Sequence, residues 1–362
     1  WLKNSGSDNR ILVVSFVFSA SSPLDMRRLR AIAKTVTPLP FLRTSSCSFS
    51  LSLGPQTVML NYQEKPPAGK RNGRYINQPD RGDAVDVAKM YETTMHNGRE
   101  LQPPATLDTM GFTLAHCPTV VKDFRDDAEV EKVYYEELRN LVKEASGAKH
   151  VLIFDHTIRE SGNTNLNAEA GGSAAPVPRV HCDYTADGAP KRLRLLGKKG
   201  INSLVRGRML TEAEVDELAS KRFAFINVWR SISDDAPVHR MPLAVMDERS
   251  MKPEDKFLYE LLFPDRVGEN YSLEFCRDHK WYYYPLMQKS ECLVFKVYEK
   301  LEDGPRFVFH TAFDDPRCPD DAPPRVSIEA RAIAFFSDES SVDQLKTEAA
   351  QEPLTLQDLT SY

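Results

Sequence analysis

The chain has 362 residues, 41% of them hydrophobic, which is enough to bury the core of one large domain or of two modest ones. Its formal net charge of −5 argues against nucleic acid as a partner, because binding to a polyanion requires clustered positive charge. The sequence has no apolar run long enough to span a membrane, so we expect no membrane association.

Six cysteines are scattered along the chain. None of them forms a CxxC pair, which argues against both a structural zinc site and a disulfide framework. We therefore expect a reducing setting and a cytoplasmic location. The cysteines are Cys47, Cys117, Cys182, Cys276, Cys292 and Cys318.

The first 58 residues have features of targeting segments but no steady periodicity. Residues 11–20 form a short apolar run after Lys3 and Arg10, which is typical of a signal-peptide core. Residues 26–62 contain no acidic residue and are rich in Arg and Ser, as in a transit peptide. A third interpretation, a translated extension upstream of the domain, is the one we favour. We predict a poorly ordered extension at 1–58 and a single domain at 59–362.

The first half of this domain is predicted to hold few regular elements. Residues 63–106 are polar and proline-rich, and we expect mostly extended loop there. Residues 128–145 have apolar side chains near helical spacing, which predicts an amphipathic helix. An apolar strand at 149–155, a loop rich in Gly, Asn and Ala at 160–175 and a short strand at 180–185 follow. Thr211 and Glu214 have capping-box spacing at the start of a second helix.

The second half is rich in strand patterns with few helices between them. Such spacing argues against a doubly wound parallel sheet and favours an antiparallel barrel or a double-sheet jelly roll. We predict a mainly β domain with flanking helices. The strand-like runs are residues 223–230, 241–247, 271–276, 281–287, 291–300, 306–313 and 325–336.

The stretch VHCDYT, residues 180–185, contains the first candidate site. In a strand, His181 and Asp183 project from the same face, whereas Cys182 points to the opposite face and into the core. Such a pair can be half of a metal site or an ordinary polar edge. An HxD pair arises about once by chance in a chain of this size, so it needs support from other residues.

His310, near the polar end of the apolar run RFVFHTAF, supplies that support. Two imidazoles and one carboxylate on one side of a metal form the facial triad of non-haem Fe(II) enzymes. Zinc is the competing metal, since His and Asp suit it as well. The alternative for His310 is a core histidine that is hydrogen-bonded to a backbone carbonyl.

The run PRVSIEARAIAFF alternates polar and apolar residues, so Arg325 and Ser327 share one face of a strand. A guanidinium can bind a carboxylate with two hydrogen bonds, and a nearby hydroxyl can add a third. That arrangement suits the distal carboxylate of a 2-oxo diacid. Arg331 shares the face but lies roughly 20 Å further along at about 3.3 Å per residue, too far to serve the same small ligand. The alternative is a solvated, charged edge strand.

The order HxD, then His, then RxS resembles the Fe(II)/2-oxoglutarate-dependent dioxygenases. More narrowly, the runs VLIFDHTIRES, VHCDYT, FINVWRSI, PLAVMDERS, HTAFDDP and PRVSIEARAIAFF are similar to those of the CmcJ/NvfI oxidoreductase family, which includes the AsaB-like hydroxylase/desaturases. The similarity extends from about residue 60 to residue 336. It implies a double-stranded β-helix, also called a jelly roll or cupin-like fold, and oxidative tailoring of small metabolites.

Carried over by position, the resemblance also implies five functional residues. The iron ligands would be His181, Asp183 and His310, and the anchor of the co-substrate 2-oxoglutarate would be Arg325 with Ser327. Two departures from the family pattern stand out. The long gap before His310 implies an insertion at about 190–220, and the long gap after it keeps Arg331 as a second candidate anchor.

Other polar residues are candidates for the wall of a substrate pocket. Asn227, Trp229 and Arg230 lie in a strand run with Ile226 and Val228, which predicts one polar face. They can line the pocket, or Arg230 can pair with a nearby acid. Arg159 and Arg331 are further pocket candidates.

These observations lead to two hypotheses of function, both with a small-molecule metabolite as the partner. The first is an Fe(II)/2-oxoglutarate-dependent oxidoreductase that hydroxylates or desaturates the metabolite. The alternative is a metal-independent jelly-roll enzyme or binding protein that steers a dehydration or cyclisation.

Overall fold

The structure is a computed structural model that describes residues 54–164, 172–199, 212–234 and 236–336. All of these residues belong to one compact unit. The described helices include none that is long and apolar enough to cross a membrane. Most of the predicted extension and the predicted cap at Thr211 lie outside the described residues.

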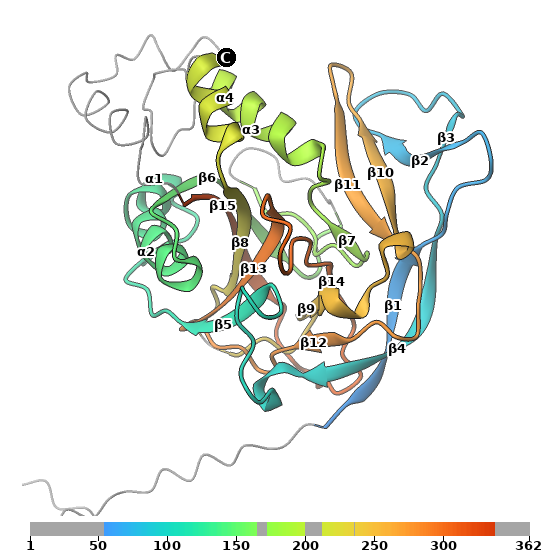
Figure 1. Ribbon diagram of the computed structural model, residues 1–362. Helices are drawn as coiled ribbons and strands as arrows, with labels where there is room; N and C mark the ends of the chain where they lie inside the picture. Colours follow the sequence, from blue (N-terminus) through green and yellow to red (C-terminus); the bar gives the residue numbers. More distant parts are fainter. Residues whose placement is uncertain (1–53, 165–171, 200–211, 235, 337–362) are drawn as a thin grey trace, which may run out of the picture. The chain divides into compact units, whose positions relative to one another are not determined.

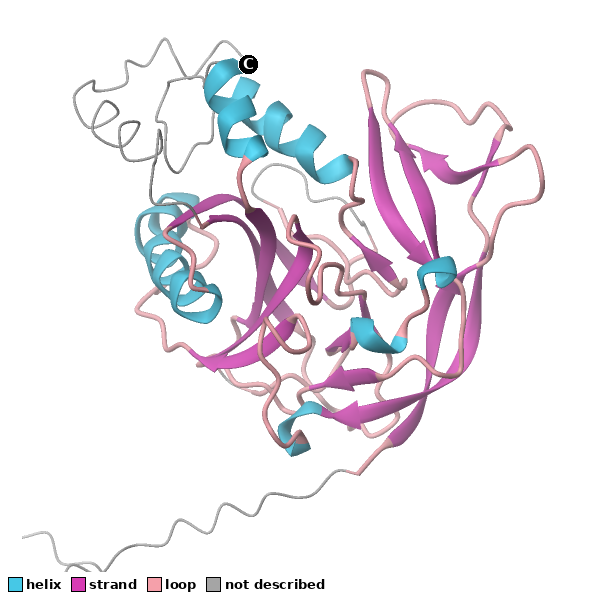
Figure 2. Cartoon of the chain, viewed as in Figure 1, coloured by secondary structure: helices cyan, strands magenta, loops and turns pink. Residues whose placement is uncertain are grey.

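Two curled sheets, shown in Figures 1 and 2, contain the described strands. The larger sheet has the order β1 (Gln56–Gln63), β4 (Ala88–Asn97), β12 (Trp281–Tyr283), β9 (Leu243–Met246), β14 (His310–Ala312), β7 (His181–Cys182), β11 (Val267–Leu273), β10 (Lys256–Leu262), β2 (Arg71–Tyr75) and β3 (Ala84–Val85). The smaller sheet has the order β5 (Phe112–His116), β13 (Glu291–Glu299), β8 (Phe223–Ser231), β15 (Val326–Phe335) and β6 (His150–Glu160).

The smaller sheet separates two hydrophobic cores because the side chains of a strand alternate between its faces. In β8, Phe225 and Trp229 point into the core between the two sheets. Ile226 and Val228 point the other way, toward the helical side of the sheet. Both faces of β8 are therefore covered, which explains why its sequence is almost continuously apolar.

Helices cover this outer face of the smaller sheet, as Figure 1 shows. The helix α1 (Asp127–Glu129) passes through the π-helical turn η2 (Val130–Tyr134) into α2 (Tyr135–Ser146), which ends at Gly147 with a left-handed φ of 71°. Two further helices, α3 (Gly188–Lys199) and α4 (Glu212–Ser220), pack against each other. Short 3-10 turns are η1 (Gly98–Glu100), η3 (Glu248–Ser250) and η4 (Pro253–Asp255).

The helix predicted at 128–145 and the strands predicted at 149–155, 223–230, 241–247, 291–300 and 325–336 are confirmed. The prediction of loop at 63–106 is wrong, because this segment contains β2, β3 and the ten-residue β4. The first half of β4 is largely exposed, and its residues show no regular alternation of apolar and polar side chains. The strands β5 and β10 also lie outside the predicted runs.

The predicted domain boundary at residue 59 falls inside a strand. Strand β1 begins at Gln56 and pairs antiparallel with β4, with Val58 opposite Thr93. The Val58 side chain is only 3% exposed and belongs to the core between the sheets. Residues 56–58 are therefore part of the folded unit.

Candidate metal centre and pocket

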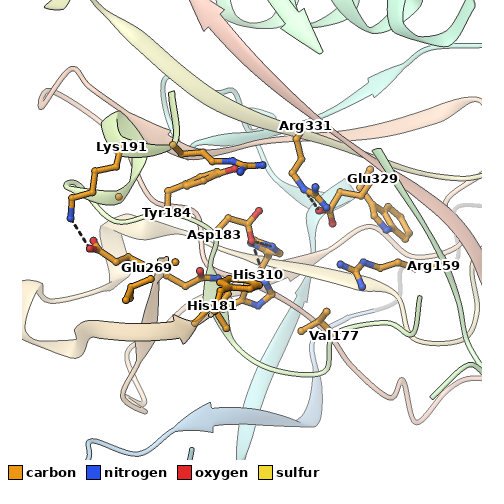
Figure 3. Close-up of a pocket in the computed structure, with 18 of the residues that line it drawn as sticks. Arg159, Val177, His181, Asp183, Tyr184, Lys191, Glu269, His310, Glu329 and Arg331 are labelled. Carbon is orange, nitrogen blue, oxygen red and sulfur yellow. Dashed lines mark hydrogen bonds and ion pairs between the residues drawn. The ribbon is translucent and has the colours of Figure 1, made fainter. Parts of the chain in front are cut away.

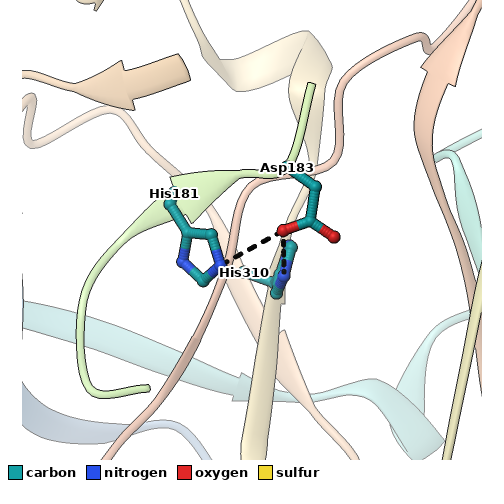
Figure 4. A group of neighbouring side chains, drawn as sticks. All are labelled: His181, Asp183 and His310. Carbon is teal, nitrogen blue, oxygen red and sulfur yellow. Dashed lines mark ion pairs between the residues drawn. The ribbon is translucent and has the colours of Figure 1, made fainter. Parts of the chain in front are cut away.

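His181, Asp183 and His310 converge on one point, as Figure 4 shows. Strands β7 and β14 pair antiparallel with His310 directly opposite His181, and the two ring centroids are 4.4 Å apart. Asp183 follows β7, which spans only two residues rather than the predicted six. Its Oδ1 lies 3.4 Å from Nε2 of His181 and 3.7 Å from Nε2 of His310.

Hydrogen bonds orient all three side chains toward this point. Nδ1 of His181 lies 2.8 Å from the carbonyl oxygen of Arg179, and Nδ1 of His310 lies 3.2 Å from that of Val308. A carbonyl can only accept, so each Nδ1 carries the proton and each Nε2 presents a lone pair. Asn227 donates to Oδ2 of Asp183 at 2.7 Å, which leaves Oδ1 facing the two imidazoles.

The electrostatics of the three groups suit a divalent cation. Burial tends to raise the pKa of Asp183, but the adjacent side chains of His181 and His310 lower it well below its usual range. Burial, together with the neighbouring His181, lowers the pKa of His310 to about 4. At neutral pH this pair is therefore a carboxylate and a neutral imidazole, the forms that bind metals. The donor set fits Fe(II) with its remaining positions open, and it also fits zinc.

The three residues line a cavity of about 540 Å³, a volume typical of small-molecule sites. Figure 3 shows Arg159, Glu329 and Arg331 on one side of the His-Asp-His group and Lys191 with Glu269 on the other. Lys191 comes from α3, and Glu269 from β11. The cavity is therefore closed in part by the segment that the sequence marks as an insertion.

Arg325 places a buried positive charge in this cavity without an ion-pair partner among the described residues. The residue is only 4% exposed, and no carboxylate within the described ranges forms an ion pair with it. Its Nη1 donates to the carbonyl of Met241, while its Nε is buried without a hydrogen-bond partner. Burial and the nearby Arg159 lower the pKa of Arg325 to about 9, so the guanidinium still carries its charge at neutral pH.

Arg331, the second candidate anchor, is already paired. Its Nη1 lies 2.6 Å from Oδ2 of Asp155, its Nη2 donates to Thr157 at 2.9 Å, and its Nε lies 3.5 Å from Glu329. The antiparallel register of β15 with β6, which sets Arg331 opposite Asp155, creates the first contact. Of the two arginines, only Arg325 has no ion pair with a carboxylate of the described residues, so it is the one open to a ligand.

Comparison with known proteins places this chain in a family. The family described as "Oxidoreductase/YMDC permease-like domain" matches residues 60–335, most of the described unit. The chain belongs to this oxidoreductase family. The resemblance to the CmcJ/NvfI group that the sequence shows is thereby confirmed.

Several members of the family have names that describe a reaction. The hydroxylase/desaturase efuI of Hormonema carpetanum is 32% identical over 255 residues, which cover 65% of this chain and 80% of that protein. The Fe(II)/2-oxoglutarate-dependent dioxygenase nvfI of Aspergillus novofumigatus is 31% identical over 282 residues, covering 75% and 94%. The solved structure of the iron and alpha-ketoglutarate-dependent endoperoxidase NvfI matches with a TM-score of 0.63 and 26% identity, over 78% of this chain and 99% of that one. The predicted jelly roll is confirmed by this match.

Of the other predicted pocket residues, some line the cavity and others do not, because strand side chains alternate between the two faces of the sheet. Arg159 and Trp229 line the cavity, and the Arg325 guanidinium lies 5.5 Å from the Trp229 ring centroid. Asn227 contacts Asp183 instead of open space. Arg230 does not line the cavity, because it points to the helical face of β8, over the Tyr134 ring.

Ser327 and Cys182 are both fully buried. The Ser327 hydroxyl donates to the carbonyl of Arg159 at 3.4 Å and does not line the cavity. Cys182 points away from the metal-binding point and donates to the carbonyl of Val297, as the alternation of the strand predicts.

The residues that line the cavity but were not predicted from the sequence include Glu329, Lys191 and Arg192. Glu329 lies on the same strand face as Arg325 and Arg331, so the alternation of β15 contains the signal that could have found it. Lys191 and Arg192 come from α3, inside the predicted insertion. Nothing in their local pattern indicates a ligand-facing position.

Proposed function

We propose that the protein is an Fe(II)- and 2-oxoglutarate-dependent oxidoreductase that hydroxylates or desaturates a small-molecule metabolite. The observation that carries the proposal is a pairing within one cavity. A convergent His-Asp-His group lies in the same cavity as the buried guanidinium of Arg325, which has no ion-pair partner among the described residues. The names of the relatives, which include Fe(II)/2-oxoglutarate-dependent dioxygenases, support it.

In this proposal His181, Asp183 and His310 hold the iron from one side. The protonated Nδ1 atoms remain bonded to backbone carbonyls, so neither imidazole has to turn when the ion binds. Asn227 holds the second carboxylate oxygen of Asp183, which fixes the orientation of the ligand. With 2-oxoglutarate and O₂, the bound iron supplies the oxidising chemistry that removes hydrogen from a carbon of the substrate.

Arg325 is the proposed partner of the distal carboxylate of 2-oxoglutarate. A carboxylate would offset the cost of burying this charge and would accept from the Nε that has no partner. Trp229 supports the guanidinium from one side. Ser327 acts indirectly. Its hydroxyl joins β15 to the backbone of Arg159 and so fixes the pairing of β15, which carries Arg325, with β6, which carries Arg159.

The remainder of the cavity would hold the metabolite. Its wall includes Lys191, Arg192 and Leu195 of α3 and the end of the β10–β11 hairpin. Lys191, Arg192 and Leu195 lie in the segment predicted to be an insertion, so they are suited to set substrate preference without disturbing the metal ligands. A cytoplasmic location completes the proposal, supported by the free thiols of all five cysteines within the described residues.

Anaerobic titration with Fe(II) and then 2-oxoglutarate tests the function. We expect the wild-type protein to develop the weak visible charge-transfer band of the iron-bound 2-oxo acid, and to release succinate when O₂ is admitted. The His181→Ala variant should do neither. The matched control is His156→Ala, since His156 contacts Tyr135 and Asp127 away from the cavity.

The metal-independent alternative gives a different result. It predicts no band and no succinate from the wild-type protein, together with unchanged metabolite turnover in the presence of a chelator. That outcome would overturn the proposed function.

A further inference from the structure

A second cluster of metal-binding side chains lies outside the cavity. Asp255, Cys276 and His279 each offer one ligand atom, and these atoms all lie within 4.8 Å of one another. None of the three lines the cavity that contains His181 and His310. The second cluster lies instead at the open end of the β10–β11 hairpin, opposite its turn, and in the connection from β11 to β12. These strands are labelled in Figure 1.

A single tight turn brings two of these ligands together. The chain reverses at residues 276–279, where the backbone N–H of His279 donates to the carbonyl of Cys276 at 3.3 Å. The result is a Cys-x-x-His spacing that directs a thiol and an imidazole to one side of the turn. Short spacings of this kind are typical of zinc sites because one turn supplies two ligands at little entropic cost.

Asp255 reaches the same point from the turn that precedes β10. It ends η4 immediately before β10, and its carbonyl accepts from the N–H of Glu274 at 2.8 Å, which ties it to the residues that lead into the turn. Its Oδ2 lies 3.2 Å from Nε2 of His279. Two ligand atoms at about 2.0–2.1 Å from a tetrahedral zinc ion are about 3.3 Å apart, so this separation fits the ion.

The imidazole of His279 is held as a metal ligand requires. Its side chain is fully buried, and its ring stacks on Tyr62 with 5.8 Å between the ring centroids. Nδ1 lies 3.2 Å from the Tyr62 hydroxyl, which also accepts from Nε1 of Trp281 at 2.7 Å. A histidine that binds a metal through one nitrogen normally hydrogen-bonds through the other, which fixes the tautomer.

Hydrogen bonding alone does not account for the position of Cys276. A chain from Tyr62 through His279 to Asp255 satisfies those three side chains by itself. Among the described residues, the Cys276 sulfur has no hydrogen-bond partner, yet it lies within reach of the same nitrogen and oxygen. The thiol is only partly buried, so water can reach this side of the cluster.

We propose that Asp255, Cys276 and His279 bind a zinc ion, with water as the fourth ligand, separately from the iron centre. Sulfur, imidazole and carboxylate together favour zinc among common divalent cations. The ion joins the β10–β11 hairpin to the connection that leads into β12. Strand β11 pairs with β7 so that Ser272 lies opposite His181, so the ion stabilises the strand beside the iron ligand.

Cobalt(II) provides a test that separates the two metal sites. We expect the full chain to bind two equivalents of Co(II) and to show a thiolate-to-cobalt charge-transfer band in the near ultraviolet. His310→Ala should lose one equivalent and keep the band, because the iron centre contains no cysteine ligand. Cys276→Ser should lose the band, and the matched control Cys318→Ser should keep it.

Zinc binding to the His310→Ala protein gives the second measurement. Without His310, the site at Asp255 should dominate, and Zn(II) should raise the unfolding temperature by mass action. Adding Cys276→Ser or Asp255→Asn should weaken Zn(II) binding by more than about a hundredfold, since even outer contacts of a metal site contribute 10–100-fold.

Three results would overturn the proposal. The first is a wild-type chain that binds Co(II) without a thiolate band, and the second is a band that persists in Cys276→Ser. The third is an equal Zn(II) stabilisation with and without Cys276 in proteins that both fold, as judged by their far-ultraviolet circular dichroism.

Discussion

Replacing Arg325 with alanine tests the proposed 2-oxoglutarate site most directly. Arg325 is 4% exposed, shares the cavity with the His-Asp-His group and has no carboxylate partner within the described residues. If it binds the distal carboxylate, its removal deletes charge-assisted hydrogen bonds from the complex. The free protein loses only a hydrogen bond to the carbonyl of Met241 and the contact with Trp229.

The magnitude follows from the type of contact. Hydrogen bonds to a charged group contribute about 1.5–3 kcal/mol, so the affinity for 2-oxoglutarate should fall by about one to two orders of magnitude. Iron affinity should stay nearly unchanged, since Arg325 has no described contact with His181, Asp183 or His310, the proposed iron ligands. Arg325→Lys should recover only part of the loss, because an ammonium group lacks the planar fork of a guanidinium.

Arg331→Ala is the matched control, and its effect should be on stability. Arg331 pairs with Asp155 and Glu329, so its removal leaves two carboxylates without their cation. We expect a loss of about 1.5–3 kcal/mol in the free energy of unfolding. This loss is less than a fully buried pair would show, because the Arg331 side chain is 21% exposed.

Anaerobic titration of 2-oxoglutarate into the Fe(II)-loaded variants, followed through the visible charge-transfer band, measures the affinities. Urea unfolding of the metal-free proteins measures the stabilities. A weaker affinity in Arg331→Ala but not in Arg325→Ala would move the anchor to Arg331. An unchanged affinity in both variants would refute the reasoning, because the co-substrate would then not be held by a buried arginine of β15.

Three further predictions concern the supporting structure. Asn227→Ala should weaken Fe(II) binding by about 10–100-fold with little change in fold, measured by anaerobic iron titration, because Asp183 loses the contact that orients it. A chain that starts at Gly54 should match the full chain in unfolding temperature, whereas one that starts at Met59 loses the buried Val58 and about 1.5–3 kcal/mol of stability; equal stability of both would contradict the role of β1. Burial tends to raise the pKa of Glu291, but hydrogen bonds from Arg99 and a backbone N–H lower it. The Arg99–Glu291 coupling in a double-mutant cycle should therefore be full above the pKa of the unfolded glutamate and shrink as the pH falls through the lower folded value; coupling that is independent of pH would contradict this assignment.

The sequence determined the elements that carry their own periodic signal. Strands β8, β13 and β15 are long and apolar because both of their faces are covered, and α2 has a clear apolar stripe. The chain order of His181, Asp183, His310 and Arg325 predicts a facial triad and an anchor, and the structure brings these four residues to one cavity. Local spacing also predicted correctly that Cys182 points away from the ligands.

Contacts between distant segments determined the features that the sequence did not predict. Strand β4 was not predicted because much of it is exposed, and its pairing with β1 and β12 defines it as a strand. Alternation within β7 indicates the face on which His181 lies but not its neighbour on the next strand. The contact between His181 and His310 depends on the pairing of β7 with β14. The cluster of Cys276 and His279 with Asp255 was not predicted because Asp255 lies in η4, before β10, about twenty residues earlier in the chain.

The choice between Arg325 and Arg331 shows the physical reason most clearly. Alternation places both on the same face of β15, and the sequence favours Arg325 only through its neighbour Ser327. The register with β6 sets Asp155 opposite Arg331 and leaves Arg325 without a carboxylate. Periodicity is a property of one segment, whereas the compensation of a charge depends on which other segment lies beside it, and only tertiary structure fixes that.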